Sequence, residues 1–148
     1  MIDAIDLKII NLLLENSRWS TTEISKHLKI SNVATQQRIT KLENHGIIKA
    51  YTAVLDYRKL DYRTVAYFGI FLEKAKDYQQ VIKELNEIPQ IVEAHFTTGN
   101  YSIFAKIYAK DNLHLMEVLN EQVQKIEGVA RTETFISLQE GIHKVVKP

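Results

Sequence analysis

The chain has 148 residues, 45% of them hydrophobic and 25% charged, which predicts a globular protein of one ordinary domain or two small ones. It has no cysteine, which excludes disulfides and thiolate metal sites and fits a cytoplasmic location. Charges or amides interrupt every apolar run before the roughly 18 residues of a membrane span, and Asp3 and Asp6 argue against a signal peptide, so we expect no membrane partner.

Helical periodicity dominates the first third of the chain. Asp3 is placed to cap a helix that runs to about Glu15 and is apolar on two sides, so we expect the second half or a partner chain to cover part of it. In the stretch SRWSTTEISKHL, Ser20 and Glu23 form an S-x-x-E capping box for a short helix that ends near Leu28.

A third helix follows after the short connection KIS. Ser31 is placed to cap it, it runs to about His45, and Gly46 is a natural residue just beyond its end. Residues 17–50 hold six basic residues against two acidic ones, although the whole chain has a net charge of only +1. Two helices joined by a short turn in a basic segment are typical of a helix-turn-helix DNA-binding domain. Residues 47–55, IIKAYTAVL, predict a strand that supplies a wing, and we place this winged helix-turn-helix domain at residues 1–55.

The third helix has one apolar and one polar side. Thr35, Ile39 and Leu42 share the side that we expect to face the core. On the other side, a Gln amide can bond adenine, a Val methyl can touch the thymine methyl, and N–H groups at the helix N-terminus favour phosphate. The predicted DNA-binding residues are Ser31, Asn32, Val33, Gln36, Gln37, Arg38, Thr40 and Lys41. For Arg38, a phosphate contact and an internal ion pair with an acid both fit, and a plain solvated face is the alternative for the whole helix.

The second half follows a polar linker at residues 56–63 and changes to alternating strand and helix patterns. The expected order is a strand at 64–73, a helix from Asp77 to Pro89, strands at 91–98 and 101–110, a helix from Asp111 to Gly128, and a last strand. This βαββαβ order predicts an α+β fold, a ferredoxin-like antiparallel sheet with helices on one face, which we assign to residues 64–140. Residues 141–148 are the predicted C-terminal tail. The other face of the sheet needs cover, and dimerisation is the simplest source.

Several stretches, taken in order, resemble the Lrp/AsnC family of bacterial and archaeal transcription regulators. They are DAIDLKIINLLLENSR, ISKHLKIS, RITKLENHGIIKAYTAVLD, AHFTTGNYSIFAKI and TETFISLQ, and together they cover nearly the whole chain. The resemblance implies double-stranded DNA as a partner, a second domain that binds a small amino-acid effector, and homodimers that assemble further, commonly to octamers. It also implies that the effector binds in clefts between neighbouring dimers.

The stretch TTGNYSIF predicts a β-hairpin tip, which the resemblance places at the effector cleft. Gly99 lets a ligand approach the backbone, and N–H groups from Gly99 to Ser102 can hold an α-carboxylate. The predicted effector-binding residues are Thr98, Gly99, Asn100, Tyr101, Ser102, Gln122, Thr132 and Thr134. Many family members have an acid where this chain has Ser102, and the serine resembles the asparagine-responsive branch. We therefore expect asparagine or a similar polar amino acid; a plain turn without ligand is the alternative.

No set of residues in the sequence predicts catalysis. The five histidines are scattered, there is no P-loop or G-x-S-x-G motif, and Glu93 and His95 form only a weak candidate pair. We expect no enzymatic activity, no metal site, and no cofactor beyond the amino-acid effector. The main alternative to an effector-responsive regulator is an architectural protein that bends or wraps DNA, and the two differ in sequence specificity.

Overall fold

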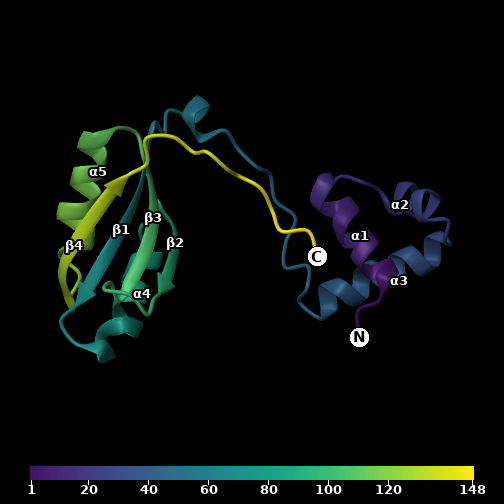
Figure 1. Ribbon diagram of the computed structural model, residues 1–148, viewed down its shortest axis with the longest axis horizontal. Coiled ribbons are helices and arrows are strands. Elements are labelled where there is room, and N and C mark those ends of the chain that lie inside the picture. The colour runs from purple at the N-terminus through teal and green to yellow at the C-terminus, as the bar shows by residue number, and fades with distance from the viewer. The chain divides into compact units, whose positions relative to one another are not determined.

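Side-chain caps define the three helices at the start of the chain. The computed structural model describes all 148 residues, and it places α1 at Ala4–Glu15, α2 at Thr21–Leu28 and α3 at Asn32–Asn44 (Figure 1). Asp3 accepts from the backbone N–H groups at the start of α1, and Ser20 and Glu23 form the predicted capping box. The Ser31 hydroxyl accepts from the N–H of Ala34, 3.1 Å away. The three predicted helices are therefore confirmed with their predicted starts.

The helices pack around a small apolar core. Its buried members are Ile9, Leu12, Ile24, Ile39 and Leu42, with partly buried Trp19 and Ile48 packed against them. Thr35, Ile39 and Leu42 are buried as predicted, so the opposite side of α3 is turned to solvent. This first unit comprises Met1–Val54 together with Ile142–Pro148.

The C-terminal tail belongs to the first unit. Its Lys147 ammonium lies 2.8 Å from the Glu15 carboxylate, and the carbonyl of Pro148 accepts from the Asn11 amide at 3.3 Å. Both contacts are with α1. The end of the chain therefore returns to the helix with which the chain begins.

The predicted wing strand at residues 47–55 is wrong. The segment contains no strand. The N–H groups of Ile47 and Ile48 instead bond the carbonyl of Leu42, at 2.9 and 3.2 Å, and so close the end of α3. Within one chain no neighbouring strand pairs with the segment, and a strand without a hydrogen-bonded partner has no ladder to stabilise it.

The second unit, Leu55–Gly141, is the predicted ferredoxin-like fold. Its strands are β1 (Thr64–Leu72), β2 (Ile91–Phe96), β3 (Ile103–Ala109) and β4 (Val129–Ile136), arranged antiparallel in the order β2-β3-β1-β4. The helices α4 (Tyr78–Asn86) and α5 (Asn112–Val118) lie on one side of the strands (Figure 1). Short 3-10 turns cover Tyr57–Leu60 and Ala75–Asp77. No helix of the protein is both long and apolar enough to cross a membrane.

Several element boundaries in this unit differ from the prediction. The helix α4 ends at Asn86 rather than at Pro89, and β2 and β3 are each shorter than the predicted 91–98 and 101–110. The α5 helix ends at Val118 and continues as one π-helical turn, Leu119–Val123, so it does not reach Gly128. The carboxylate of Asp77 does not cap α4; it accepts from the N–H of Lys74 at 3.1 Å and closes the preceding turn.

The two faces of the sheet have different environments. Alternation along β1 turns Ala66, Phe68 and Ile70 into the core beneath the helices, and the three are fully buried. The opposite side carries an aromatic surface, which we call the open face. The open face consists of Val65, Tyr67, Gly69, Phe71, Phe104, Lys106, Tyr108, Arg131, Glu133 and Phe135, together with Tyr101 from the loop before β3. At one edge, the ring centroid of Tyr57 in the first 3-10 turn lies 4.4 Å from that of Tyr108. The helices α4 and α5 lie on the other side of the sheet, and several rings of the open face contact one another.

Candidate nucleic-acid interface and ligand hairpin

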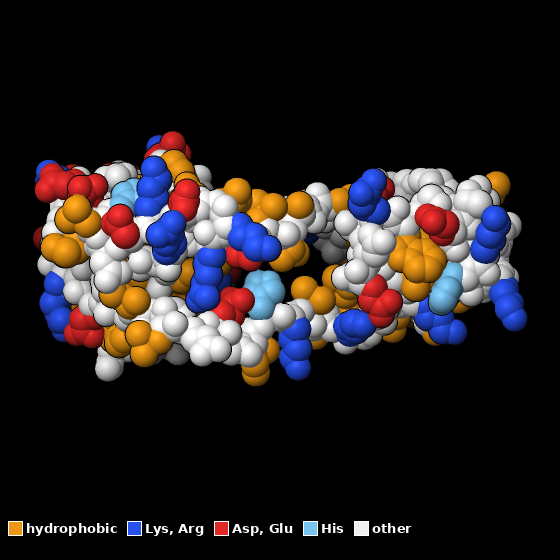
Figure 2. Space-filling view, turned by 90° about the horizontal axis from the view of Figure 1, so that it is seen from above, with side chains coloured by type: hydrophobic (Ala, Val, Ile, Leu, Met, Phe, Trp, Pro, Cys, Tyr) orange, Lys and Arg blue, Asp and Glu red, His pale blue; other side chains and the backbone are white.

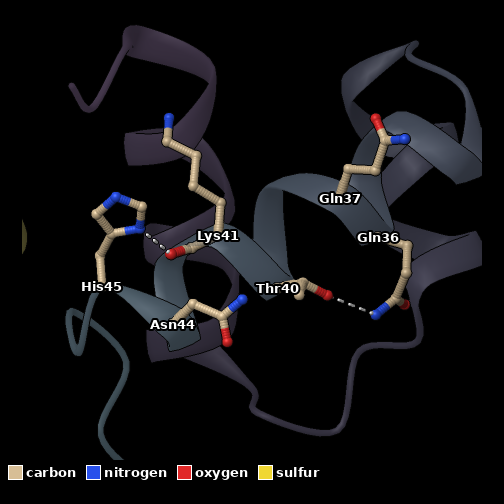
Figure 3. Close-up of a pocket in the computed structure, with 6 residues that line it drawn as sticks. All are labelled: Gln36, Gln37, Thr40, Lys41, Asn44 and His45. Carbon is tan, nitrogen blue, oxygen red and sulfur yellow. Dashed lines mark hydrogen bonds between the residues drawn. The ribbon is translucent and has the colours of Figure 1, made fainter.

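A hollow of about 370 Å³ lies along the exposed side of α3. The hollow is lined by Gln36, Gln37, Thr40, Lys41, Asn44 and His45 (Figure 3). Four of these residues belong to the predicted DNA-binding set. Asn44 shares their helical arc, whereas His45, predicted only to end the helix, is its C-cap and also lines the hollow.

Side chains on this surface hold one another by hydrogen bonds. The Gln36 amide oxygen accepts from the hydroxyl of Thr21 at 3.0 Å, and its nitrogen lies 3.4 Å from the Thr40 hydroxyl (Figure 3). The His45 Nδ1 lies 2.8 Å from the Lys41 carbonyl. These exposed bonds exchange readily with water or with a partner that offers similar groups, because a neutral hydrogen bond stabilises by only about 1 kcal/mol net.

The N-terminus of α3 is open to solvent. Ser31, Asn32 and Val33 are all exposed, and the Val33 side chain retains 68% of its accessible surface. The Asn32 amide reaches the Thr22 hydroxyl at 3.4 Å. An exposed helix N-terminus presents free N–H groups and the positive end of the helix dipole to an anion.

Arg38 and Lys41 contact acids of α1. The Arg38 guanidinium lies 2.6 Å from the Asp3 carboxylate and 2.7 Å from that of Asp6. The Lys41 ammonium lies 2.8 Å from Asp6 and 2.8 Å from the backbone oxygen of Met1. Of the two roles open to Arg38, the structure shows the internal ion pair. Lys41, predicted only as a DNA contact, also has an internal partner.

Asp6 has no exposed surface and receives both bases. Burial alone would raise the pKa of Asp6, but hydrogen bonds from Lys41 and Arg38 outweigh it and lower the pKa from 3.8 to about 2. The hydrogen bond between Arg38 and Asp3 raises the pKa of Arg38, as does the one between Arg38 and Asp6, and it lowers the pKa of Asp3. Asp3, Asp6 and Arg38 are therefore charged at neutral pH, and their ion pairs join the start of α1 to α3.

On the face drawn in Figure 2, the charges of the first unit are mixed rather than gathered in one patch. In Figure 2, basic side chains stand around the edge of the first unit, with acidic and hydrophobic side chains between them.

The predicted hairpin has a longer connection than a tight turn. The strand β2 ends at Phe96 and β3 begins at Ile103, so residues 97–102 join them. Neither Gly99 nor Asn100 has a positive φ, which a two-residue type I′ turn requires. Thr98, Gly99 and Asn100 are exposed, and a Cβ placed on Gly99 would meet open space.

Two backbone bonds anchor the end of this connection. The Ser102 N–H donates to the Ile70 carbonyl on β1 at 2.9 Å, and the Ser102 carbonyl accepts from the Thr97 N–H at 3.0 Å. Thr132 on β4 pairs with the same Ile70 from the other side. The structure therefore brings the Ser102 backbone and Thr132 to the same end of the sheet, one on each side of β1.

The other predicted effector residues do not all gather there. The Thr132 and Thr134 side chains lie on the helix-covered face, because they pair with the core residues Ile70 and Phe68, whereas the Tyr101 ring lies on the open face. Gln122 is exposed on the π-helical turn, and the side chain that bonds Thr132 is Gln124, at 3.2 Å. The sequence did not indicate Gln124, because the π-helical turn shifts the side chains that follow it around the helix axis.

The candidate catalytic pair is exposed. His95 Nε2 lies 3.8 Å from the Glu93 carboxylate on β2, and both side chains retain more than half of their accessible surface. No group of three or more His, Asp or Glu side chains is placed to hold a metal ion.

Two family models match this architecture. Residues 2–43 match the AsnC-type helix-turn-helix domain, which contains α1, α2 and nearly all of α3. Residues 65–145 match the Lrp/AsnC ligand binding domain. This range contains the second unit apart from its first ten residues, 55–64.

Whole-chain relatives agree with both matches. The chain is 40% identical to Regulatory protein AsnC of Haemophilus influenzae, over 99% of this chain and 98% of the relative. It is 33% identical to Regulatory protein AsnC of Escherichia coli, and the solved structure of E. coli AsnC superposes with a TM-score of 0.94 over 100% of this chain and 99% of that one. A transcriptional regulator of Neisseria meningitidis, solved in complex with L-Met, has the same fold at 23% identity, with a TM-score of 0.94 over 100% of this chain and 97% of that one. The chain belongs to the Lrp/AsnC family of transcriptional regulators, with a helix-turn-helix domain followed by a ligand-binding domain.

Proposed function

We propose that the protein is a sequence-specific DNA-binding regulator whose assembly or DNA affinity responds to a small polar amino acid, asparagine first. The observation that carries the proposal is α3, whose apolar side is buried while Gln36, Gln37 and Thr40 line an exposed hollow. A helix held in this way can enter the DNA major groove, where amide and methyl groups distinguish bases.

Each part of the α3 surface has its own task in this proposal. Gln36 and Gln37 read base edges, and the Val33 methyl groups contact thymine. Ser31 and Asn32, with the free N–H groups of the helix end, hold a phosphate. Arg38 holds α3 against α1 through Asp3 and Asp6, so its contribution to DNA binding is indirect. Lys41 keeps about a third of its side-chain surface exposed while it pairs with Asp6, so its ammonium also adds positive charge to the edge of the hollow.

The amino acid binds at the exposed tip of the loop that joins β2 and β3. The N–H groups of Gly99, Asn100 and Tyr101 receive its α-carboxylate, since the Ser102 N–H is already donated to the Ile70 carbonyl. The hydroxyl groups of Ser102, Thr132 and Thr134 bond a polar side chain. The exposure of Thr98, Gly99 and Asn100 supports this role, as does the open space around Gly99, because a ligand can approach the backbone there.

Assembly connects the two functions. The chain forms homodimers through the open face, and dimers assemble to a higher oligomer, an octamer in the simplest case. The amino acid shifts the equilibrium between assembly states by binding one of them more tightly than the other, since a ligand of equal affinity for both shifts nothing.

The DNA part is tested by sequence preference. Sequences selected from a random duplex library should bind the wild-type protein at least about 10³-fold more tightly than shuffled duplexes. Replacing Gln36 and Gln37 together by Ala should reduce that ratio by about 10-fold or more, because two base-reading amides are lost. Replacing Gln79 and Gln80, an exposed glutamine pair on α4, is the matched control and should leave the ratio unchanged. A wild-type ratio near one would favour the architectural alternative.

The effector part is tested by thermal unfolding with each of the twenty L-amino acids in millimolar excess. A ligand present at about 100 times its Kd stabilises the folded protein by about 2.7 kcal/mol. Asparagine should raise the melting temperature, and Ser102→Ala should reduce the rise. Ser137→Ala, beside Val65 at the far end of β1, is the control. If no amino acid raises the melting temperature, the loop is not an amino-acid site.

A further inference from the structure

The side chain of Tyr101 crosses a strand of the sheet at a glycine. Tyr101 stands in the loop just before β3, and in the sheet order β1 separates β3 from β4. Its ring passes over β1 at Gly69 and its hydroxyl reaches Glu133 on β4, with a donor-to-acceptor distance of 2.7 Å. Gly69 pairs directly with Glu133 in the register of the two strands, so the ring spans one whole strand.

Only glycine leaves room for this crossing. A Cβ built on Gly69 would lie 2.2 Å from Cδ1 and 2.3 Å from Cγ of the Tyr101 ring, well inside any real contact. The backbone of Gly69 does not need the conformational freedom of glycine, since its φ is not positive. The glycine is therefore explained by the space that the ring occupies.

The hydroxyl end of Tyr101 is held by a chain of charged groups. Glu133 accepts from Arg131 at 2.8 Å as well as from Tyr101, and the Arg131 guanidinium stands 3.8 Å from the centre of the Phe71 ring. The hydrogen bond to Glu133 raises the pKa of Tyr101, and Tyr101 and Arg131 lower the pKa of Glu133. Hydrogen bonds to an ionised carboxylate are stronger than neutral ones, so this end is well anchored.

The backbone end of Tyr101 lies in the candidate ligand loop. Its carbonyl accepts from the Thr97 hydroxyl, and the next residue, Ser102, donates its N–H to Ile70 on β1. The Tyr101 side chain and the backbone of residues 101 and 102 thus both fix the end of the loop that leads into β3. Thr98, Gly99 and Asn100, in the middle of the loop, remain exposed.

We propose that Tyr101 is a positioning residue: its ring on Gly69 and its hydroxyl on Glu133 hold the backbone N–H groups of residues 99–101 in the arrangement that receives the effector carboxylate. The proposal deepens the proposed function and depends on it for the ligand. It changes the role expected from the sequence, in which Tyr101 contacts the ligand itself, because the ring lies on the open face of the sheet.

The first experiment needs no ligand. One Hα of Gly69 points at the Tyr101 ring, and protons that face an aromatic ring shift upfield in NMR spectra. We expect an upfield-shifted Gly69 Hα in the wild-type protein, loss of the shift in Tyr101→Leu, and faster exchange of the Ser102 amide proton, by about 10-fold or more. Gly69→Ala should give the same increase, and Gly99→Ala should leave the Ser102 amide unchanged. Unshifted Gly69 protons, or unchanged exchange in Tyr101→Leu, would overturn the proposal.

The second experiment separates positioning from folding. Tyr101→Phe keeps the ring and loses only the hydroxyl, so the melting temperature without ligand should stay close to that of the wild type. Its Kd for L-asparagine, or for whichever of the twenty L-amino acids stabilises the wild type, should rise about 10-fold, because one charge-assisted bond no longer fixes the loop. Glu133→Ala should weaken binding similarly, and Glu133→Gln, which still offers an acceptor oxygen, should restore most of it.

The outcomes distinguish this proposal from the proposed function. If Tyr101→Phe and Glu133→Ala bind the amino acid as tightly as the wild type, the positioning role is wrong even though the protein binds the effector. If the wild type binds no amino acid, the proposed function fails, and the exchange rates decide whether Tyr101 orders the loop.

Discussion

Asp6 is a single carboxylate on which the contact between α1 and α3 depends. It is fully buried, and Arg38 and Lys41 both approach it within 2.8 Å. Its second oxygen also accepts from the Asp3 N–H at 3.1 Å, which closes the capping box of α1. A buried charge is tolerated only when its lone pairs are satisfied, and here protein groups satisfy both oxygens.

Replacing Asp6 by Asn should therefore strongly destabilise the first unit. The variant removes the charge and leaves Arg38 and Lys41 without their shared partner, and breaking a buried pair costs about 3–5 kcal/mol. Urea unfolding followed by the fluorescence of Trp19, the only tryptophan, measures this loss. Asp3→Asn is the control, because Asn caps a helix as well as Asp does and Asp3 is half exposed. Equal losses in the two variants would contradict the role assigned to Asp6.

The same carboxylate makes stability depend on pH. The pKa of Asp6 is lowered on folding, from 3.8 to about 2, so the unfolded chain binds its proton first as the pH falls. The stabilisation is complete above about pH 4 and is lost as the pH falls towards 2; it amounts to about 2–3 kcal/mol. Unfolding measured between pH 5 and 2 should show this loss in the wild type and a flatter dependence in Asp6→Asn.

At the scale of elements, the sequence predicted the starts of the helices best, because contacts between residues close in the sequence determine them. Each helix of the first unit begins at a side chain that bonds N–H groups two or three residues away, as Ser20 and Ser31 do. Such signals need no distant partner. The segment 47–55 has the composition of a strand, but a strand exists only where another one pairs with it, and the sequence does not state that pairing.

The candidate site shows the same division. Helical periodicity was enough to find the exposed arc of Gln36, Gln37 and Thr40, because one buried side of a helix fixes the other. The internal partners of Arg38 and Lys41 lie more than 30 residues away in the sequence, and Gln124 reaches Thr132 only through a π-helical turn. Contacts of this kind follow from the tertiary structure.

Gly46 gives a test of how α3 ends. Its φ is +67°, and a Cβ there would meet no atom within 4 Å, so only backbone strain opposes a side chain. Gly46→Ala should destabilise the protein by about 1–2 kcal/mol. Gly99→Ala has the same open surroundings without a positive φ and should leave stability within about 0.5 kcal/mol of the wild type. Thermal unfolding compares the two, and an equal effect would mean that the left-handed backbone is not what requires Gly46.

At the scale of the whole molecule, the open face is the feature that a single chain leaves unexplained. Its rings contact one another, with the centroids of Tyr67 and Phe104 6.0 Å apart and those of Phe104 and Phe135 6.4 Å apart. Lys106 has little exposed surface and lies over the rings of Tyr67 and Tyr108. A large aromatic surface rimmed by charged groups is typical of a protein interface.

Changing this face should therefore alter assembly. Phe135 is about half exposed on β4, and Phe135→Asp places a charge where a second copy would bury it. The dimer dissociation constant should rise at least about 30-fold, because aromatic residues central to an interface contribute 2 kcal/mol or more. Sedimentation velocity over a dilution series measures it. Leu113→Asp makes the same change at an exposed residue of α5, on the helix side of the sheet, and should leave the dimer intact. If Leu113→Asp yields monomers and Phe135→Asp does not, the chains pair through their helices, and the Tyr101 anchor then lies on a surface that faces solvent in the assembly.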